Sequence, residues 1–297
     1  MLSPSYAVGF VGLGAMGSQL SRHALEAGLE VWVHDLDPAR VAALSDQGAH
    51  AAAELADLAR RCRWIVTSLP TASALHGVVD QVAGAPGPER GGLIETSTLS
   101  VEDKERAAAT LGAAGLGMVD APLSGTSQQA ATRDLIAYVS GSPEDCAAAL
   151  PVIRTFTRAQ YQLGRLGNGT RMKLVANHLV AIHNVAAAEA LLLAARAGLD
   201  LPAVIEAVSD GAGGSRMLQV RGPLMASGEY AATMRVDNFV KDIDIIEQHA
   251  GSLGSPVPLL AECARLYRTM LESGRGDLDT AAVFDELLRG SEQAREA

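Results

Sequence analysis

Glycines at fixed spacing are the first feature of this sequence that could carry chemistry. Gly12, Gly14 and Gly17 follow an apolar run that ends at Val11, and a helical pattern follows them. Glycine permits a tight turn at the first position, close backbone approach to a pyrophosphate at the second, and close packing of helix on strand at the third. The N-terminus of such a helix offers N–H groups and a positive dipole end to phosphates. The pattern predicts a dinucleotide site formed by Gly12, Leu13, Gly14, Ala15, Met16 and Gly17, with an ordinary glycine-rich turn as the alternative.

An acidic residue, Asp35, ends the second apolar run. It lies close to the offset at which a carboxylate binds the ribose hydroxyls of a dinucleotide. The same carboxylate would repel the 2′-phosphate of NADP, and Leu36 stands where a phosphate-binding arginine could follow. We therefore expect NAD and disfavour NADP. Two alternatives stay open, because Arg40 could turn toward a phosphate and Asp35 could be a turn acid before Pro38.

Short apolar runs alternate with alanine-rich helical patterns through the first half of the chain. Two of these helical patterns cover residues 18–27 and 39–47. Strand and helix alternating in this way predict an α/β fold with a parallel, doubly wound sheet. The expected strands are Tyr6–Val11, Glu30–His34, Trp64–Ser68, Gly92–Glu95, Met118–Asp120, Leu135–Val139 and Ala159–Leu163.

The strand signal ends near residue 165. A long helix is expected over Thr170–Ala197, stopped by Gly198, because glycine favours the left-handed cap just past a helix end. The length of 297 residues suits two domains. We expect an α/β domain over residues 1–165 and an all-helical domain over residues 166–297, with the long helix joining them. Further helices are expected at Pro202–Ser209, Asp237–Leu253, Leu259–Ser273 and Ala281–Arg289.

Composition narrows the class of partner. The net charge is −10 and aromatic residues make up 4% of the chain, which disfavours nucleic acid and anionic membrane surfaces. Cys62, Cys146 and Cys263 show neither a disulfide framework nor zinc-ligand spacing, which suits buried, reduced thiols in a cytoplasmic protein. No signal peptide is visible. The longest apolar stretch, Leu174–Ala195, contains asparagine, histidine and glutamate, so a buried helix is expected rather than a membrane span.

Four segments in order resemble the β-hydroxyacid dehydrogenase superfamily, which includes 3-hydroxyisobutyrate and L-threonate dehydrogenases. They are Phe10–Gly17, Asp120–Gly125, Gly164–Asn177 and Phe239–Ile243, and together they span most of the chain. The resemblance implies a Rossmann-type nucleotide-binding domain and a helical second domain that usually mediates oligomerisation. It also implies a hydride transfer between the dinucleotide and a small hydroxy acid. The stretch Gly211–Met217 brings the sequence nearest to the threonate-dehydrogenase-like branch.

The resemblance places Lys173 as the general acid–base and Asn177 beside it, binding substrate and positioning the ammonium. Spaced i and i+4, the two residues share one face of the long helix. Oxidation at a carbinol carbon needs removal of the hydroxyl proton, and the reverse reaction needs a proton donor to the carbonyl oxygen. A lysine serves both directions if burial or a nearby cation lowers its pKa toward neutrality. Without the resemblance, a lysine is more often a solvated surface residue.

The other site residues also follow from the resemblance. Ser124, with the backbone N–H groups of Gly125 and Thr126, is expected to hold the substrate carboxylate, and a plain turn serine is the alternative. Leu69, Pro70 and Thr98 are expected to contact the cofactor. Lys241 is expected near the nicotinamide, unless it is a surface lysine paired with Asp237 or Asp244.

The sequence departs from the family pattern in the substrate loop. Thr126 stands where a second glycine is usual, and Arg133 with Asp134 replaces the usual Gly-Thr, which leaves the substrate unidentified. Arg216 and Arg221 could bind a substrate anion or form surface salt bridges. No metal is expected, since no third ligand is spaced with His178 and His183, and both are expected to be buried helix contacts.

Two rival functions remain. An imine reductase has the same two-domain plan, but Lys173 argues against it, since those enzymes generally carry another residue there. A non-enzymatic protein on this fold would be expected to lack the lysine or to carry an added module. The family also suggests a homodimer or homotetramer in which the long helix is shared between subunits.

Overall fold

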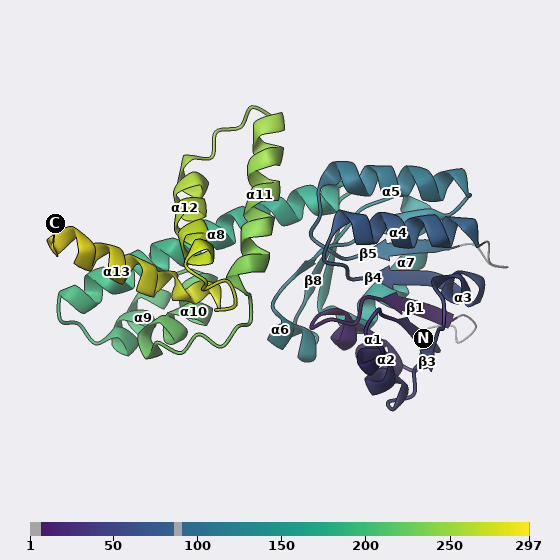
Figure 1. Ribbon diagram of the computed structural model, residues 1–297, viewed down its shortest axis with the longest axis horizontal. Coiled ribbons are helices and arrows are strands. Elements are labelled where there is room, and N and C mark those ends of the chain that lie inside the picture. Colours follow the sequence, from purple (N-terminus) through teal and green to yellow (C-terminus); the bar gives the residue numbers. More distant parts are fainter. Residues whose placement is uncertain (1–6, 86–90, 297) are drawn as a thin grey trace. The chain divides into compact units, whose positions relative to one another are not determined.

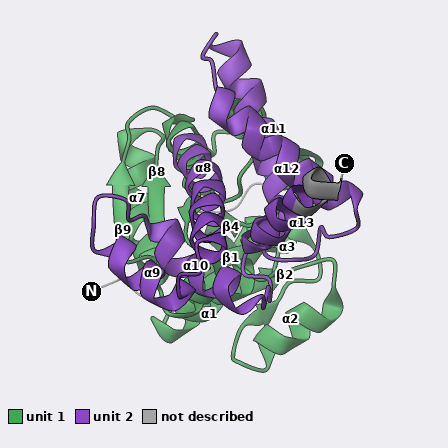
Figure 2. Cartoon of the chain, turned by 90° about the vertical axis from the view of Figure 1, so that its left-hand side faces the viewer, with its two compact units in different colours: residues 1–173 green, residues 174–297 purple. Residues whose placement is uncertain are grey.

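The computed structural model describes residues 7–85 and 91–296. The chain divides into two compact units, residues 1–173 and 174–297 (Figure 2). Tyr6, with which the first expected strand began, lies outside the described residues. The division falls within the long helix α8 (Asn168–Arg196), eight residues beyond the expected boundary at residue 165.

A six-stranded parallel sheet forms the centre of the N-terminal unit, in the order β3-β2-β1-β4-β5-β6 (Figure 1). This confirms the doubly wound α/β prediction. The two-residue strand β3 was not predicted, because it is too short and too exposed to show an apolar run. The strands are β1 (Ala7–Val11), β2 (Val31–His34), β3 (His50–Ala51), β4 (Cys62–Thr67), β5 (Gly92–Glu95) and β6 (Gly117–Asp120).

Helices cover both faces of this sheet, because successive residues of a buried strand point to opposite sides. Val8 and Phe10 of β1 pack on one side with Leu20 of α1 and Ile153 of α7. On the other side, Val11 packs in a second cluster with residues of α3, α4 and α5. The helices are α1 (Gly17–Glu26), α2 (Pro38–Ser45), α3 (Leu55–Arg61), α4 (Ala72–Gly84), α5 (Val101–Ala113), α6 (Ser127–Ala131) and α7 (Pro143–Phe156).

Two of the expected strands belong to a separate three-stranded sheet. In it, β7 (Leu123–Ser124) pairs antiparallel with β8 (Ile136–Val139), and β8 pairs parallel with β9 (Ala159–Gln162). Pro122, which has no N–H to donate to a ladder, separates β7 from the end of β6. The small sheet therefore begins where the main sheet ends, and an isolated bridge between Asp120 and Ser140 links them.

In its described residues the C-terminal unit is built from helices, as expected, with one isolated bridge between Arg235 and Asp279. The helix α10 was not predicted, because Gly222 and Pro223 interrupt its pattern. Apolar faces of these helices pack around Phe239 and Tyr267 into one core. Besides the end of α8, the unit contains α9 (Leu201–Ser209), α10 (Arg216–Ser227), α11 (Val236–Ser252), α12 (Pro258–Glu272), the 3-10 turn η1 (Thr280–Ala282) and α13 (Val283–Glu296).

Among residues 7–85 and 91–296, α8 is the one helix whose length and composition could suit a membrane span, with a hydropathy of 1.5. Polar side chains interrupt it, and two of them are buried within the unit. Asn184 donates its amide N–H to Tyr267 Oη at 2.5 Å and to the carbonyl of Thr280 at 2.9 Å. Two asparagines of α8 are thus buried and hydrogen-bonded within the C-terminal unit, but only 39% of its apolar 18-residue window is buried, so the expectation of a buried helix holds for one face of α8 and not for the whole helix.

Arg221 is not available to bind a substrate anion, which corrects one of the two arginine expectations. Its side chain is 1% exposed, with Nε 3.3 Å from Asp279 Oδ1 and 2.9 Å from Thr280 Oγ1. Asp279 also accepts hydrogen bonds from the backbone N–H groups of Thr233, Met234 and Ala281. Arg221 is therefore the counter-charge of a buried carboxylate rather than a surface cation. Arg216 lies exposed at the start of α10.

The Asp279 pair predicts a pH-dependent contribution to stability. Burial alone raises the pKa of Asp279, but Arg221 and three backbone N–H groups outweigh it and hold the pKa below its ordinary value. The contribution is thus complete above the ordinary pKa and is lost as pH falls through the lower folded value. We expect Asp279→Asn to cost about 3 kcal/mol of unfolding free energy at neutral pH. Denaturant unfolding should show that the difference in unfolding free energy between the wild type and Asp279→Asn is unchanged down to about pH 5 and becomes smaller below about pH 4. A difference that stays constant to acid pH would contradict the assignment.

Candidate active site

The glycine turn is shaped by close contacts that leave no room for side chains at two positions. Gly12 has a φ of +84°, and a Cβ there would lie 2.3 Å from the carbonyl oxygen of Ser68. A Cβ on Gly17 would lie 1.9 Å from the carbonyl oxygen of Gly12. A Cβ on Gly14 would meet nothing nearer than Arg40 Nη1 at 3.9 Å, so the space above this glycine is open. No side chain caps the start of α1, which leaves the helix end for an anion, and the turn fits a pyrophosphate.

Asp35 holds the glycine turn against the end of β2. Its Oδ2 accepts the Leu13 N–H at 2.6 Å, and its Oδ1 accepts the Asp37 N–H at 2.8 Å. Arg40 lies beside it, with Nη1 3.7 Å from Asp35 Oδ2 and Nε 3.3 Å from Asp37 Oδ2. The carboxylate therefore fixes the turn and places negative charge beside it, while the half-exposed Arg40 is engaged by two acids.

A groove of about 400 Å³ continues from the glycine turn between α1 and α2. Its lining combines the turn with two arginines and two glutamines, which gives it a polar, partly basic wall. Its size suits part of a nucleotide rather than a whole dinucleotide. The lining residues are Leu13, Gly14, Ala15, Ser18, Gln19, Arg22, Arg40, Ala43, Leu44 and Gln47.

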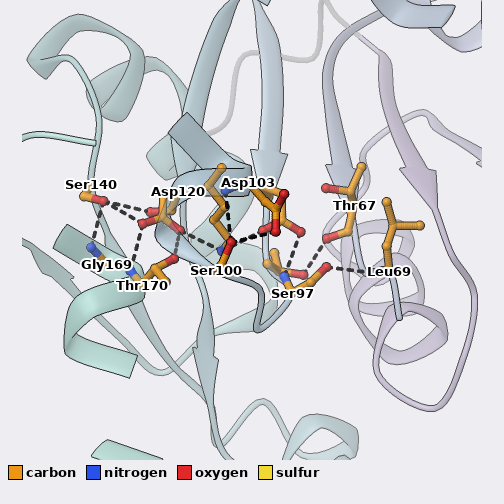
Figure 3. A network of polar contacts seen from close by, with 12 residues as sticks. Thr67, Leu69, Ser97, Ser100, Asp103, Asp120, Ser140, Gly169 and Thr170 are labelled. Atoms are coloured by element: carbon orange, nitrogen blue, oxygen red, sulfur yellow. Dashed lines mark hydrogen bonds and ion pairs between the residues drawn. The ribbon is translucent and has the colours of Figure 1, made fainter. Parts of the chain in front are cut away.

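The loops that follow β4 and β5 are fastened together at the carboxyl edge of the sheet (Figure 3). The N–H of Leu69 donates to Ser97 Oγ at 2.8 Å, and the N–H of Ser97 donates to Glu95 Oε1 at 2.9 Å. Thr98 follows half-buried, and Pro70 is exposed. Nucleotides bind at this edge in doubly wound folds, so Leu69, Pro70 and Thr98 lie on the side of the sheet where cofactor residues are expected.

The substrate loop is more constrained than its sequence indicated. Gly125 has a φ of +141°, and a Cβ there would lie 2.5 Å from Leu135 Cδ2. Thr126 caps α6 through a capping box, in which its N–H donates to Gln129 Oε1 at 3.0 Å and its Oγ1 accepts the Gln129 N–H. The Thr126 N–H, expected to hold a carboxylate, is thus already bonded. The Thr-x-x-Gln spacing is a helix-start signature that could have revealed this.

Lys173 projects from a helix start that Asp120 anchors. Thr170 donates its N–H to Asp120 Oδ2 and its hydroxyl to Asp120 Oδ1, both at 2.8 Å, and the Gly169 N–H donates to Ser140 Oγ at 2.8 Å (Figure 3). A Cβ on Gly169 would lie 2.2 Å from the Tyr138 carbonyl oxygen, so the first turn of α8 is packed closely. Lys173 itself is 7% exposed. Its backbone is fixed by contacts that the sequence reasoning did not identify.

Asp242 joins two of the expected site residues within the C-terminal unit. Asn177, 2% exposed, donates its Nδ2 to Asp242 Oδ2 at 2.9 Å. Lys241 Nζ lies 3.5 Å from Asp242 Oδ1. Asp242 therefore fixes the orientation of the Asn177 amide and partly balances Lys241. The sequence reasoning treated Asp242 only as part of the segment motif.

The remaining titratable candidates lie outside this constellation. His178 is half-buried and His183 is exposed, so the expectation that both are buried is wrong for His183, which falls on the solvent side of α8. Across the part of the chain that the structure describes, no three histidine, cysteine or acidic side chains gather as metal ligands. Cys62, Cys146 and Cys263 are buried and unpaired, and burial raises the pKa of the Cys263 thiol to about 11.

Two family models match the chain in sequence order. Residues 7–164 match the NAD binding domain of 6-phosphogluconate dehydrogenase, and residues 167–287 match the NAD-binding domain of NADP-dependent 3-hydroxyisobutyrate dehydrogenase. The chain belongs to the β-hydroxyacid dehydrogenase superfamily. The glycine turn and Asp35 lie in the first matched segment, and Lys173, Asn177 and Lys241 lie in the second.

Relatives of this superfamily member cover nearly its whole length. L-threonate dehydrogenase from Cupriavidus necator is 32% identical over 280 residues, covering 93% of this chain and 94% of that protein. A crystal structure of 3-hydroxyisobutyrate dehydrogenase from Salmonella typhimurium is 34% identical, with a TM-score of 0.85 over 95% of this chain and 99% of that one. The expected family, fold and nucleotide-binding domain are thereby confirmed. An imine reductase from Pseudomonas, 22% identical with a TM-score of 0.58 over 95% and 99% of the two chains, shares the fold alone.

The different surroundings of two glycines give a matched test of the dinucleotide turn. Gly14→Ala should melt near the wild-type temperature, because its Cβ enters open space, yet should weaken NAD binding at least about tenfold by blocking the pyrophosphate. Gly17→Ala should instead cost about 1–3 kcal/mol of stability through overpacking. Calorimetric titration with NAD and thermal melting measure both. Undiminished NAD affinity in Gly14→Ala would place the cofactor elsewhere.

Proposed function

We propose that this chain is an NAD-dependent oxidoreductase that transfers a hydride between the nicotinamide and a small hydroxy acid of the threonate or 3-hydroxyisobutyrate type. The observation that carries the proposal is Lys173, a buried lysine one turn into a helix whose first turn is anchored by Asp120. An ammonium held this way can exchange a proton at a defined position. The names of the relatives support the substrate class.

Each protein group has one task in this proposal. Lys173 takes the hydroxyl proton during oxidation and returns it during reduction, with Asn177 positioning its ammonium. Ser124 Oγ and the Gly125 N–H hold the substrate carboxylate, and Thr126 supports the loop through its capping box.

Lys241, beside Asp242, adds positive charge on the C-terminal unit. When bound, the nicotinamide supplies the two-electron acceptor carbon for the hydride.

The dinucleotide would lie along the glycine turn, Gly12–Gly17, and the carboxyl edge at Leu69, Pro70 and Thr98. We favour NAD over NADP because Asp35 presents a carboxylate there, while Arg40 is engaged by Asp35 and Asp37. In this proposal, residues 1–165 bind the dinucleotide and residues 166–297 complete the substrate site.

Self-association through α8 follows from the same proposal. Large apolar side chains lie exposed along α8 at helical spacing, namely Met172, Val175, Leu179 and Leu193. Exposed apolar stripes of this kind are typical of an interface. We propose a homodimer or homotetramer that buries this stripe, and a cytoplasmic location, in keeping with three buried thiols and with the bacterial dehydrogenases that the chain resembles.

Replacing Lys173 tests the mechanism. With NAD and a panel of threonate, 3-hydroxyisobutyrate, glycerate, 4-hydroxybutyrate and serine, the wild type should oxidise at least one acid. Lys173→Met should lower kcat about 10²- to 10⁴-fold while keeping NAD affinity, because only the proton acceptor is removed. The half-buried neighbour Arg171, which pairs with Glu105 and not with a proposed site residue, provides the control, and kcat of Arg171→Ala should stay within about twofold of the wild type.

The panel also discriminates the rival activity. Turnover that survives in Lys173→Met would remove lysine from the mechanism. If the wild type reduces cyclic imines and oxidises no hydroxy acid, imine reductase activity would be favoured instead.

Replacing Leu179 tests the interface. Leu179→Glu places a charge in the middle of the stripe, so the assembly should dissociate toward monomers, because a buried unpaired carboxylate is costly. Light scattering after size-exclusion chromatography measures the mass, and Leu253→Glu, at an exposed leucine at the end of α11, is the control. An unchanged mass for Leu179→Glu would exclude α8 as the main interface.

A further inference from the structure

Among the described residues, the proposed mechanism leaves two fully buried cations unused, Arg221 of the C-terminal unit and Lys104 of the N-terminal unit. Lys104, on α5, is 0% exposed, and its Nζ lies 2.6 Å from Glu95 Oε2 and 2.8 Å from Asp120 Oδ1. Burial alone lowers the pKa of Lys104, but the Asp120 and Glu95 carboxylates outweigh it and raise the pKa. Lys104 is therefore an ammonium shared by two buried carboxylates, and the three groups carry one net negative charge.

Through Glu95, this cluster is hydrogen-bonded to the loops at the carboxyl edge of the sheet, where the cofactor is expected to bind. Glu95 Oε1 accepts the Ser97 N–H, and Ser97 Oγ accepts the Leu69 N–H. The loops after β4 and β5 are thus held by a hydrogen-bond chain that ends on a charged carboxylate. Displacement of Glu95 would displace the backbone of Ser97 and, through it, Leu69.

The Asp120 side reaches the helix that carries the catalytic lysine. Both Asp120 oxygens accept from Thr170, and Oδ2 also accepts from Ser140 Oγ at 3.0 Å (Figure 3). Ser140 Oγ in turn accepts the Gly169 N–H. A carboxylate at a helix N-terminus interacts favourably with the helix dipole. Asp120 thereby sets the position of the turn that precedes Lys173.

We propose that Lys104 is a positioning residue that couples the dinucleotide edge at Leu69 and Ser97 to the first turn of α8. This inference rests on the proposed function. Its chemistry is electrostatic, since one ammonium ties two carboxylates that each organise a different part of the site. Buried ion clusters add little net stability compared with apolar residues of similar volume, so a role in geometry accounts better for this one.

Two variants distinguish a positioning role of Lys104 from its contribution to the stability of the fold. Lys104→Met leaves two buried carboxylates without a counter-charge and should destabilise the fold. The double variant Lys104→Met with Glu95→Gln keeps the net charge of the cluster at minus one and keeps an acceptor for the Ser97 N–H. Its melting temperature should therefore recover toward the wild type, while the link between Glu95 and Asp120 stays broken.

A loss of positioning should lower kcat and leave KM nearly unchanged. The double variant should lose about 10- to 100-fold in kcat, because small misplacements of reacting groups are costly. KM for the hydroxy acid and the affinity for NAD should change less than about threefold. Asp279→Asn is the matched control, since it alters a buried, ion-paired carboxylate of the C-terminal unit and should lower stability without this loss of kcat. Recovery of kcat together with stability in the double variant would reduce Lys104 to a structural role and overturn the proposal.

Amide hydrogen exchange tests the coupling without turnover. NAD binding should slow exchange of the Gly169 and Thr170 amides in the wild type, and this slowing should disappear in the double variant. Equal slowing in both proteins would overturn the proposal. A wild type that binds NAD but oxidises no acid would count against the proposed function instead, and the exchange result would still decide the coupling.

Discussion

The carboxylate of Asp120 is the constraint on which the N-terminal unit depends. It is fully buried at the end of β6 and collects contacts from the Lys104 ammonium, the Ser140 hydroxyl, and the N–H and hydroxyl of Thr170. A buried charge is stable only when its surroundings satisfy it so completely. Because the contacts come from α5, from Ser140 directly after β8 and from α8, one carboxylate fixes the relation between the main sheet, the small sheet and the start of the lysine helix.

At the glycine turn, the backbone position is determined by close contacts that leave no space for side chains. The turn closes because Gly12 and Gly17 have no side chains, and Gly169 enters α8 against the Tyr138 carbonyl for the same reason. The resulting backbone positions are determined by contacts with other backbone atoms, which deform little. Charged side chains then complete each position, with Asp35 on the turn and Asp242 on Asn177. In each unit, a partly buried acid therefore orients a candidate site residue or turn.

Local features of the sequence were sufficient to predict much of this arrangement. The apolar strands and the spacing of Gly12, Gly14 and Gly17 are short-range signals, and they predicted the parallel sheet and the turn correctly. The sequence did not predict strands β3 and β7 or helix α10, because two-residue strands and a helix with Gly222 and Pro223 have no clear periodicity. The spacing of Thr126 and Gln129 is sufficient to predict the capping box, whereas the family resemblance implies substrate binding for Thr126.

The interactions that organise the site were beyond sequence reasoning, because they join residues far apart in the chain. Asp120 meets Thr170 fifty residues later, and Asn177 meets Asp242 sixty-five residues later. Nothing near Lys104 or Arg221 in the sequence distinguishes a buried cation from a solvated one. Burial and pairing follow only from packing, so the sequence predicts either an anion contact or a surface salt bridge for Arg221 and assigns no role to Lys104.

The most direct test of hydride transfer through Lys173 uses an accepted hydroxy acid that carries deuterium on its carbinol carbon. Nuclear magnetic resonance of the reduced nicotinamide then locates the label. The account predicts that the wild type transfers the deuterium to C4 of the nicotinamide, one per oxidised acid, and that Lys173→Met forms labelled product about 10²- to 10⁴-fold more slowly. Reduced nicotinamide without the label, or formation of labelled product by Lys173→Met at the wild-type rate, would contradict it.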